Sequence, residues 1–426
     1  MKGQGDILML SVFFQERSTK MTAMALSAQV SANERTLHVA FELGSEKWIL
    51  AFAVEGGRGL LQRTVLAGDL KGVLEHIGKL EERFGLPPDS GVLSVYEAGR
   101  DGFWLHRWLL EQGFRSQVVD SASIKVDRRK RRVKTDRLDA HELVTMLLRQ
   151  SAGERKVWSV VQVPSREAED LRRLQRQMGR LKVDYGRHLA RIRAVLVTYG
   201  IQQHPEVAVK ELRTLRSPAG EALGEHARGE IRREWKSAQL IAKHIKQISV
   251  ERHRLERTAG SEGSPKTFRA IAILVALKGI GTEAAWMLAT EMFGWRKFQN
   301  RKQIASAAGL CGSHYSSGKS EHDQGISKAG NRRVRSMMVE IAWLWLRYQS
   351  ESSLTKWFYA AVGTKRLRRN RIVGVARKLL IALYRWVEYG ELPQGAVLSP
   401  SLPAHVRRVL GQGWVVRSGT EAPAAA

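Results

Sequence analysis

Four acidic side chains in the N-terminal third of the chain have types and spacing suited to holding a divalent cation. Asp136 and Asp139 stand three residues apart on an expected helix, so their carboxylates project from one face. Glu42 and Glu97 each stand at the end of an expected strand. Carboxylate oxygens suit the hard ion Mg²⁺, for which Mn²⁺ could substitute, and two such ions could clamp the attacking and leaving oxygens of a phosphodiester. Each acid is also explained by a helix cap or a surface ion pair, so the spacing alone is a weak indication.

A glycine- and serine-rich stretch, residues 307–343, places candidate nucleophiles next to cationic side chains that could stabilise a transferring phosphoryl group. The hydroxyl candidates are Ser313, Tyr315, Ser316, Ser317 and Ser320. The neighbouring cations are Lys319, Lys328, Arg332, Arg333 and Arg335. From composition alone, the favoured explanation is an ordered loop without chemistry.

Three further segments have the composition of nucleic-acid contacts. Residues 125–134 are a basic tract, and residues 365–378 form a basic segment after three consecutive aromatic residues. Residues 279–281 form a Gly-Ile-Gly turn in a helix-hairpin-helix-like element, which can present backbone N–H groups to a phosphate. A solvated helix face and simple packing are the ordinary alternatives. The residues that we expect at nucleic acid are Lys125, Arg128, Arg129, Lys130, Arg131, Arg132, Lys134, Gly279, Gly281, Lys319, Lys328, Asn331, Arg332, Arg333, Arg335, Lys365, Arg366, Arg368 and Arg369.

The overall charge favours a polyanionic partner. Lys and Arg total 70 against 42 Asp and Glu, which gives a formal net charge of +28. Such an excess repels itself unless a polyanion neutralises it, and nucleic acid gains affinity from counterion release. A membrane surface is the weaker alternative because the basic residues are spread along the chain. The single cysteine, Cys311, excludes an internal disulfide and a cysteine-based zinc site, and no apolar run approaches the ~18 residues of a membrane span. We expect a cytoplasmic protein without a membrane partner, on the nucleoid when bound to DNA.

The acids depend on an α/β domain near the N-terminus. Two β-rich runs in residues 36–54 predict a hairpin, and further strands are expected at residues 91–96 and 116–119. Helices are expected at residues 70–84 and 103–112. This alternation of strands and helices indicates the α/β class.

Apolar residues recur at helical spacing farther along the chain. From Leu171 to Leu196 they follow one another at spacings of 3, 4, 3, 4, 4, 3 and 4, a heptad-like stripe, and a second stripe runs from Ala238 to Leu255. We interpret them as an antiparallel coiled-coil hairpin that could serve as an oligomerisation arm, although two helices packed on their own domain explain the pattern equally well. The expected organisation is a disordered extension (1–34), an α/β domain (35–160), the hairpin (165–258), a mainly helical C-terminal domain (267–390) and a frayed tail (391–426).

Four blocks of sequence, in this order, resemble one family. They are VYEAGRDGFWLHRWLLEQG (95–113), KTDRLDAHELV (134–144), GIGTEAAWMLATE (279–291) and GLCGSHYSSGKSEHDQGISKAGNRRVR (309–335). They resemble the IS110 family of insertion-sequence transposases, which is related to the Piv-type DNA invertases and includes bridge-RNA-guided recombinases. The resemblance extends from about residue 37 to 390. It implies a transposase or site-specific recombinase that acts on donor and target DNA.

The resemblance also implies a RuvC-like, RNase H-type N-terminal domain with four metal-binding acids. The last three match Glu97, Asp136 and Asp139. The first is usually an aspartate, and the matching residue here is Glu42, which is one methylene longer and would reach a metal with altered geometry.

In its C-terminal domain the family carries a nucleophilic serine just before a glycine. In SHYSSGKS this residue is Ser317, with Ser316 as the adjacent alternative. By resemblance, the serine forms a covalent phosphoserine link with DNA, while the acidic cluster comes from the other domain of the same or another subunit. The family further implies dimers to tetramers assembled through the helical arm, and a structured bridge RNA that guides target choice.

Three other hypotheses remain open at this point. A RuvC-like nuclease would hydrolyse DNA with two metals and no covalent step. A decayed, nucleic-acid-binding remnant is compatible with the departure at Glu42. A tyrosine recombinase using Tyr315 is remote, because no supporting Arg/His constellation is evident.

Overall fold

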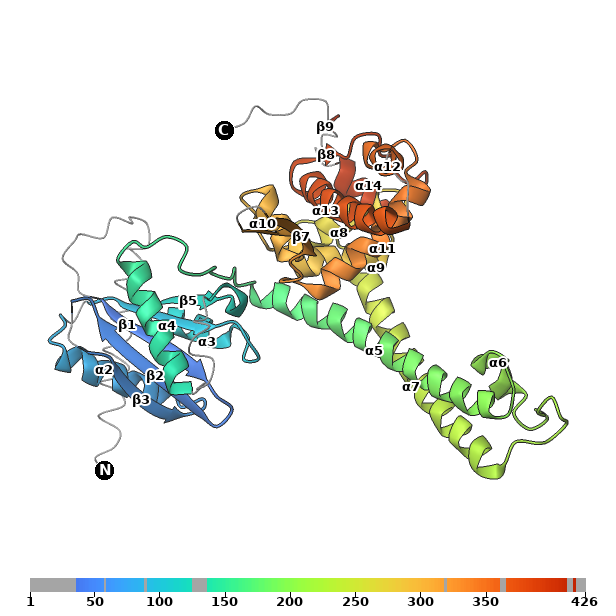
Figure 1. The fold of residues 1–426 in the computed structure, drawn as a ribbon, viewed down its shortest axis with the longest axis horizontal. Coiled ribbons are helices and arrows are strands. Elements are labelled where there is room, and N and C mark those ends of the chain that lie inside the picture. Colours follow the sequence, from blue (N-terminus) through green and yellow to red (C-terminus); the bar gives the residue numbers. More distant parts are fainter. Residues whose placement is uncertain are drawn as a thin grey trace. The chain divides into compact units, whose positions relative to one another are not determined.

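The computed structural model describes residues 36–56, 59–87, 90–124, 136–317, 320–360, 365–411 and 417–418. Of these, residues 314–317, 320–324, 365–366 and 417–418 are described by their backbone alone. The chain divides into two compact units, Met1–Val163 and Pro164–Ala426 (Figure 1). The predicted extension, 1–34, and the basic tract, 125–134, lie outside the described residues.

A five-stranded mixed sheet forms the centre of the N-terminal unit, in the order β3-β2-β1-β4-β5. β1 pairs antiparallel with β2 and parallel with β4; β3 is antiparallel to β2, and β5 is parallel to β4. The strands are β1 (Leu37–Leu43), β2 (Lys47–Val54), β3 (Leu61–Leu66), β4 (Val92–Glu97) and β5 (Arg115–Val119). The helices are α2 (Leu70–Arg83), α3 (Trp104–Glu111), the 3-10 turn η1 (Ser121–Ser123) and α4 (Asp136–Ser151). The predicted α/β class is confirmed, and β3 is a strand that the sequence pattern did not predict.

Helices cover both faces of this sheet. Phe41 of β1 is buried in a cluster with Val73 of α2 and Leu105 of α3. Its neighbour Ala40 is buried on the opposite face, in a cluster with Leu143 of α4. The alternation of side chains along a strand therefore assigns α4 to one face and both other helices to the other.

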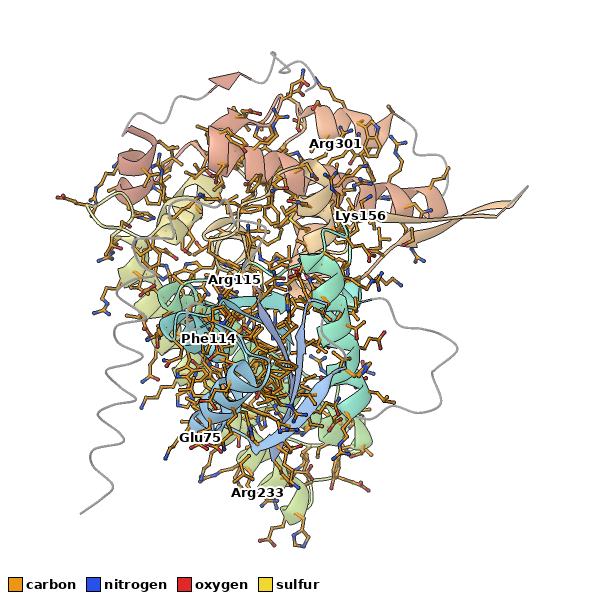
Figure 2. All side chains as sticks on the ribbon, turned by 90° about the vertical axis from the view of Figure 1, so that its left-hand side faces the viewer. Glu75, Phe114, Arg115, Lys156, Arg233 and Arg301 are labelled. Carbon is orange, nitrogen blue, oxygen red and sulfur yellow. The ribbon has the colours of Figure 1, made fainter. Side chains whose placement is uncertain are left out.

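The C-terminal unit begins with two long helices that lie antiparallel along each other (Figure 1). They are α5 (Arg166–Thr198) and α7 (Glu225–Glu256), joined through the short α6 (Pro205–Lys210). Ile192 and Leu196 from the predicted stripe of α5 are buried with Ile231 of α7. Exposed basic side chains such as Arg233 extend from α7 (Figure 2). Whether this arm joins subunits stays a prediction.

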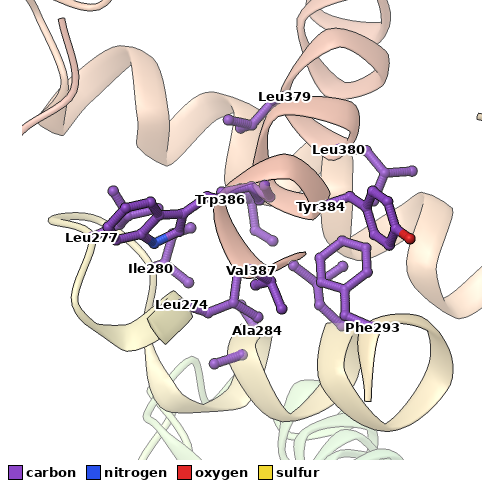
Figure 3. Packing of buried hydrophobic residues seen from close by; sticks show 14 of the residues in the cluster. Leu274, Leu277, Ile280, Ala284, Phe293, Leu379, Leu380, Tyr384, Trp386 and Val387 are labelled. Carbon is purple, nitrogen blue, oxygen red and sulfur yellow. The ribbon is translucent and has the colours of Figure 1, made fainter. Parts of the chain in front are cut away.

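The rest of the unit is a helical core around α13. The elements are α8 (Lys266–Val275), α9 (Thr282–Leu288), the π-helical turn η3 (Ala289–Phe293), α10 (Arg301–Ala307), β6 (Gly312–Ser317), β7 (Ser320–Ile326), α11 (Arg332–Tyr348), α12 (Ser353–Tyr359), α13 (Lys365–Tyr389), β8 (Glu391–Leu392), α14 (Ala404–Gly411) and β9 (Arg417–Ser418). Trp386 of α13 is fully buried among residues of α8 and α9, and its indole N–H donates to the carbonyl of Ile273 at 2.9 Å (Figure 3). Among the described residues, no helix combines the length and apolar character that crossing a membrane requires.

Part of the segment that we expected as a frayed tail is instead ordered. α14 packs against the core through Val406 and Val409, which are 0% and 1% exposed. Two apolar side chains on one face of a short helix contribute enough burial to fix it. Residues 412–416 and 419–426 of the expected tail lie outside the described residues.

Candidate metal centre and serine hairpin

Strand alternation places Glu42 and Glu97 on the same face of the sheet. Ala40 of β1 and Val95 of β4 are buried against α4, and Glu42 and Glu97 each follow two residues later. The last parallel pair between these strands is Phe41 with Tyr96, so the two acids occupy the next register position. Neighbouring strands lie about 4.8 Å apart, so both carboxylates start from adjacent points at the carboxyl ends of β1 and β4.

The first turn of α4 brings two more acids to this face. Ala140 and Leu143 are buried against the sheet. Asp136 and Asp139 stand four residues before them, so they share the sheet-facing side of the helix. The two aspartates lie in the first turn of α4, before its first buried residue Ala140, and next to Glu42 near the end of β1.

Three of the four predicted acids form a compact cluster. Glu42, Asp136 and Asp139 each offer a carboxylate oxygen, and these oxygens lie within 4.8 Å of one another. Asp136 is exposed, while the other two are half-buried. Gln62 of β3 holds the start of α4 by donating its side-chain N–H to the carbonyl of Arg137 at 2.7 Å. Carboxylate oxygens at this separation suit a hard divalent cation, so the cluster could bind a metal.

Glu97 joins this centre through a cleft and is not part of the compact cluster. The cleft has a volume of about 310 Å³ and is lined by Glu42 and Glu97 and by residues of the loop after β4. Arg100 and Asp101 of that loop, and Ser121 of η1, also line it. The Arg100 guanidinium lies 3.3 Å from the Asp101 carboxylate. The structure therefore places all four predicted acids at one end of the sheet, with carboxylate oxygens of three of them within 4.8 Å of one another.

Arg100, Asp101 and Ser121 were not among the residues predicted from the sequence. The first two follow Glu97 in the run EAGRD, directly after a buried strand. A strand end followed by a glycine-containing loop is a common position for functional side chains, and this pattern could have identified them. Ser121 is distant from these residues in the sequence but close to them in the fold. Its hydroxyl donates a hydrogen bond to the carbonyl of Ala98 at 3.3 Å.

Ser317 lies in the C-terminal unit, at the last position of β6. Its backbone pairs with that of Ser320 in β7, so it stands next to the tip of an antiparallel hairpin. The composition predicts an ordered loop without chemistry; the segment is ordered but forms two paired strands, since backbone hydrogen bonds between strands do not depend on apolar side chains. Whether it carries chemistry stays a prediction. The Ser317 side chain and the whole of Lys319 lie outside the described residues.

The base of this hairpin is tied to the helical core by backbone hydrogen bonds. The N–H of Ser327 donates to the carbonyl of Cys311 at 2.8 Å, and that of Lys328 donates to Gly309 at 3.2 Å. Lys328 itself has a φ of +57°, a conformation uncommon for a residue with a side chain. The chain leaving β7 is thus held in one specific turn.

Close backbone packing fixes that turn further. Gly330 has a φ of +143°, and a Cβ at this position would lie 2.6–2.8 Å from backbone atoms of the turn that ends α10. Arg335 Nη1 donates to the carbonyls of Ala308 and Lys328 at 3.2 and 3.0 Å. Arg335, which we predicted to contact nucleic acid, therefore also stabilises this turn. We call the turn and the end of α10 beneath it the platform of the hairpin.

Asn331 connects this platform to a buried carboxylate that was not predicted from the sequence. Its side-chain oxygen accepts from the N–H groups of Arg333 and Val334, which caps α11. Its amide N–H donates to Glu291 at 2.9 Å. The Glu291 side chain is fully buried in η3 and also accepts from Arg176 of α5 at 2.7 and 3.0 Å. Its surroundings in the sequence, MLATEMFGW, give no indication of such partners.

The other predicted nucleic-acid residues have varied surroundings. Gly279 has a φ of +90°, and an added Cβ would lie 3.1 Å from Tyr348, so this glycine has a packing role. The exposed members are Gly281, Lys328, Arg332, Arg333, Arg368 and Arg369. The side chains of Lys365 and Arg366 lie outside the described residues, as do all the members from Lys125 to Lys134. Contact with nucleic acid stays a prediction for each.

Comparison with known proteins assigns the chain to a family. A sequence model of the IS116/IS110/IS902 transposase family matches residues 271–357, which include the hairpin. "Putative transposase y4rJ" of Sinorhizobium fredii is 37% identical over 375 residues, covering 85% of this chain and 94% of that relative. The chain belongs to the IS116/IS110/IS902 family of transposases. "Putative transposase y4qE" of the same organism is 26% identical over 389 residues, 90% of this chain and 89% of the relative. The transposase for insertion sequence element IS1328 of Yersinia enterocolitica is 30% identical over 129 residues, 30% of this chain and 36% of the relative.

Membership in this family confirms the resemblance drawn from the four sequence blocks. It makes DNA the substrate class and transposition the activity. The excess of positive charge is consistent with such a substrate.

Proposed function

We propose that this transposase cuts and rejoins DNA through a covalent link to Ser317, assisted by a divalent cation at Glu42, Glu97, Asp136 and Asp139. One observation carries the proposal. The carboxylate oxygens of Glu42, Asp136 and Asp139 lie within 4.8 Å of one another, although they come from a strand and a helix far apart in the sequence. Carboxylate oxygens gathered at this separation are the ligands that a hard divalent cation prefers.

The donor set fits Mg²⁺, because all its atoms are carboxylate oxygens. Glu42, Asp136 and Asp139 would hold the ion, and Glu97 would face it across the shared cleft. A bound Mg²⁺ supplies charge stabilisation to a transferring phosphoryl group. A mixed sheet with acids at the ends of parallel strands and at the start of the covering helix supports a RuvC-like assignment for this unit.

The serine supplies the nucleophile in this proposal. Its hydroxyl oxygen forms a bond to a DNA phosphorus, the bond to one sugar oxygen breaks, and that oxygen leaves with a proton while the serine proton passes to solvent. The released sugar oxygen of a second strand then attacks the phosphoserine and restores the hydroxyl. A fixed turn beneath the hairpin supports this role, because a nucleophile must be held in place to react efficiently.

Guidance by a structured RNA and assembly through the α5–α7 arm complete the proposal, and both rest on the family resemblance. The net charge of +28 is compatible with RNA as well as DNA. If purified protein recombined donor and target DNA in the absence of RNA, guidance would be refuted. A monomer in sedimentation experiments with DNA present would refute assembly.

Metal binding and DNA cutting by Asp139→Asn test the cluster. This variant should lose Mn²⁺ binding, measured by electron paramagnetic resonance, and metal-dependent cutting, while DNA binding persists. Glu75→Gln is the matched control, because Glu75 is an exposed acid on α2, on the opposite face of the sheet. Equal Mn²⁺ binding by Asp139→Asn and the wild type would refute the metal centre.

A hydrolytic nuclease is the competing function, favoured by the same acidic cluster. It requires the metal centre but no serine, so it predicts that Ser317→Ala still cuts DNA. Metal binding without any cutting would instead favour a remnant that binds nucleic acid.

A further inference from the structure

Two aromatic rings on the C-terminal unit remain largely exposed although buried neighbours hold them in place. Trp343 of α11 is 38% exposed and Tyr359 at the end of α12 is 60% exposed. Both contact Phe358, which is fully buried, in edge-on geometry with ring centroids 6.0 and 5.2 Å apart. The two exposed rings are therefore at most about 11 Å apart and are positioned by one core residue.

A cation already lies over one of these rings. The Arg368 guanidinium of α13 lies 5.2 Å from the centre of the Trp343 ring. Among the described residues, neither Arg368 nor the exposed Arg369 pairs with a carboxylate. The guanidinium over the Trp343 ring places a positive charge close to the exposed Tyr359 ring, and an aromatic ring near a cation suits a base with its phosphate.

The local charge favours a polyanionic partner over a basic or purely apolar one. Residues 340–371 contain seven Lys or Arg and two acids, Glu340 and Glu351. Glu351 is already paired with Lys356 at 3.0 Å. A polyanion gains from this excess, whereas a purely apolar partner would leave it uncompensated.

We propose that Trp343, Tyr359 and Arg368 form a stacking surface for the unpaired bases of single-stranded DNA. Only a base outside a duplex exposes its flat face to an aromatic ring, so the surface selects single strands. DNA is the substrate class of this family. The inference rests on membership in the family and is independent of the serine and metal chemistry.

Tyr359→Ala tests the surface directly, in the full-length protein with a short oligothymidine and a duplex of equal length. We expect single-strand binding, followed by fluorescence anisotropy, to weaken about 5- to 150-fold, while duplex binding stays unchanged. The salt dependence should also stay unchanged, because no charge is removed. Arg368→Ala should instead lower the salt slope for the single strand by about 0.7.

Tyr389→Ala is the matched control. Tyr389 at the end of α13 is 54% exposed and also stands edge-on to a neighbouring ring, but its sequence neighbours include Glu388 and Glu391. It should bind the single strand like the wild type. Trp343→Phe should retain binding and Trp343→Ala should lose it, which separates stacking from general damage to the fold.

Three results would overturn the inference. Tyr359→Ala could bind the single strand as tightly as the wild type, or Tyr389→Ala could lose as much affinity as Tyr359→Ala. An RNA oligonucleotide of the same length that binds much more tightly than the DNA would overturn the assignment to DNA. None of these outcomes depends on strand cutting, so a failure here is distinct from a failure of the proposed chemistry.

Discussion

Glu291 offers a sharp test of how the C-terminal unit is stabilised. Its carboxylate is fully buried and is shared by Arg176, Arg172 and Asn331, at distances from 2.7 to 3.5 Å. Burial acts to raise its pKa, but the hydrogen bonds and charges of Arg176, followed by Arg172 and Asn331, outweigh burial and lower the pKa below its usual value. The ionised carboxylate therefore stabilises the fold.

Glu291→Gln keeps the shape of the side chain and removes its charge. Arg172 and Arg176 are 12% and 35% exposed, so both would lose their counter-charge in a partly buried place. Removing one partner of a buried ion pair costs about 3–5 kcal/mol. Since solvent still reaches Arg176, we expect about 3 kcal/mol, the lower end, which corresponds to a decrease in melting temperature of roughly 6–12 °C.

Urea unfolding of the full chain, followed by tryptophan fluorescence, measures this loss. Because the pKa of Glu291 is lowered in the folded state, its stabilising effect is complete above the unfolded pKa of about 4.3 and is lost as pH falls through the folded pKa. The difference in free energy of unfolding between the wild type and Glu291→Gln should therefore be largest near neutral pH and shrink in acid.

Two variants control the interpretation. Glu351→Gln removes an exposed acid paired with Lys356 and should change stability little. The double variant Glu291→Gln/Asn331→Asp exchanges the amide and the carboxylate, keeps the cap of α11 and should recover part of the loss. If Glu291→Gln unfolded like the wild type at every pH, the stabilising role assigned to this cluster would be wrong.

Three further predictions concern the two sites. Glu42→Gln should weaken Mn²⁺ binding by roughly tenfold, because it removes one negative charge from the cluster with Asp136 and Asp139; unchanged binding would show that Glu42 is not a ligand. Gly330→Ala should cost about 1–3 kcal/mol in chemical unfolding and slow the reaction of the serine, because its Cβ would overlap backbone atoms. In Gly325→Ala the added Cβ would meet no atom within 4 Å, so this variant should lose less stability than Gly330→Ala. Equal losses of stability in the two variants would remove the argument for a packed platform.

The elements predicted from the sequence are those whose apolar residues form a recognisable run or repeat. Successive side chains of β1 and β4 alternate between the two buried clusters of the sheet, and the apolar residues of α5 form a heptad-like stripe. Each element type is therefore recognisable from its sequence. β3 was missed because it is a half-exposed edge strand with polar residues. The β6–β7 hairpin was missed because its order comes from backbone pairing, which composition does not report.

The candidate site was likewise predicted only where its residues follow a local sequence pattern. The spacing of Asp136 and Asp139 follows from helical geometry, and strand alternation explains why Glu42 faces them. Contacts between elements distant in the sequence leave no local pattern. Glu291 illustrates this, because its partners are 40 to 119 residues away and each is an ordinary polar residue by itself.

Capture of a covalent protein–DNA adduct tests the central claim most directly. The protein is incubated with a DNA fragment carrying the element's junction, the candidate RNA and Mg²⁺, and then denatured. The account predicts an adduct that persists through denaturation, is lost in Ser317→Ala and is retained in Ser316→Ala. Cut DNA ends without any adduct, or an adduct that survives Ser317→Ala, would contradict it.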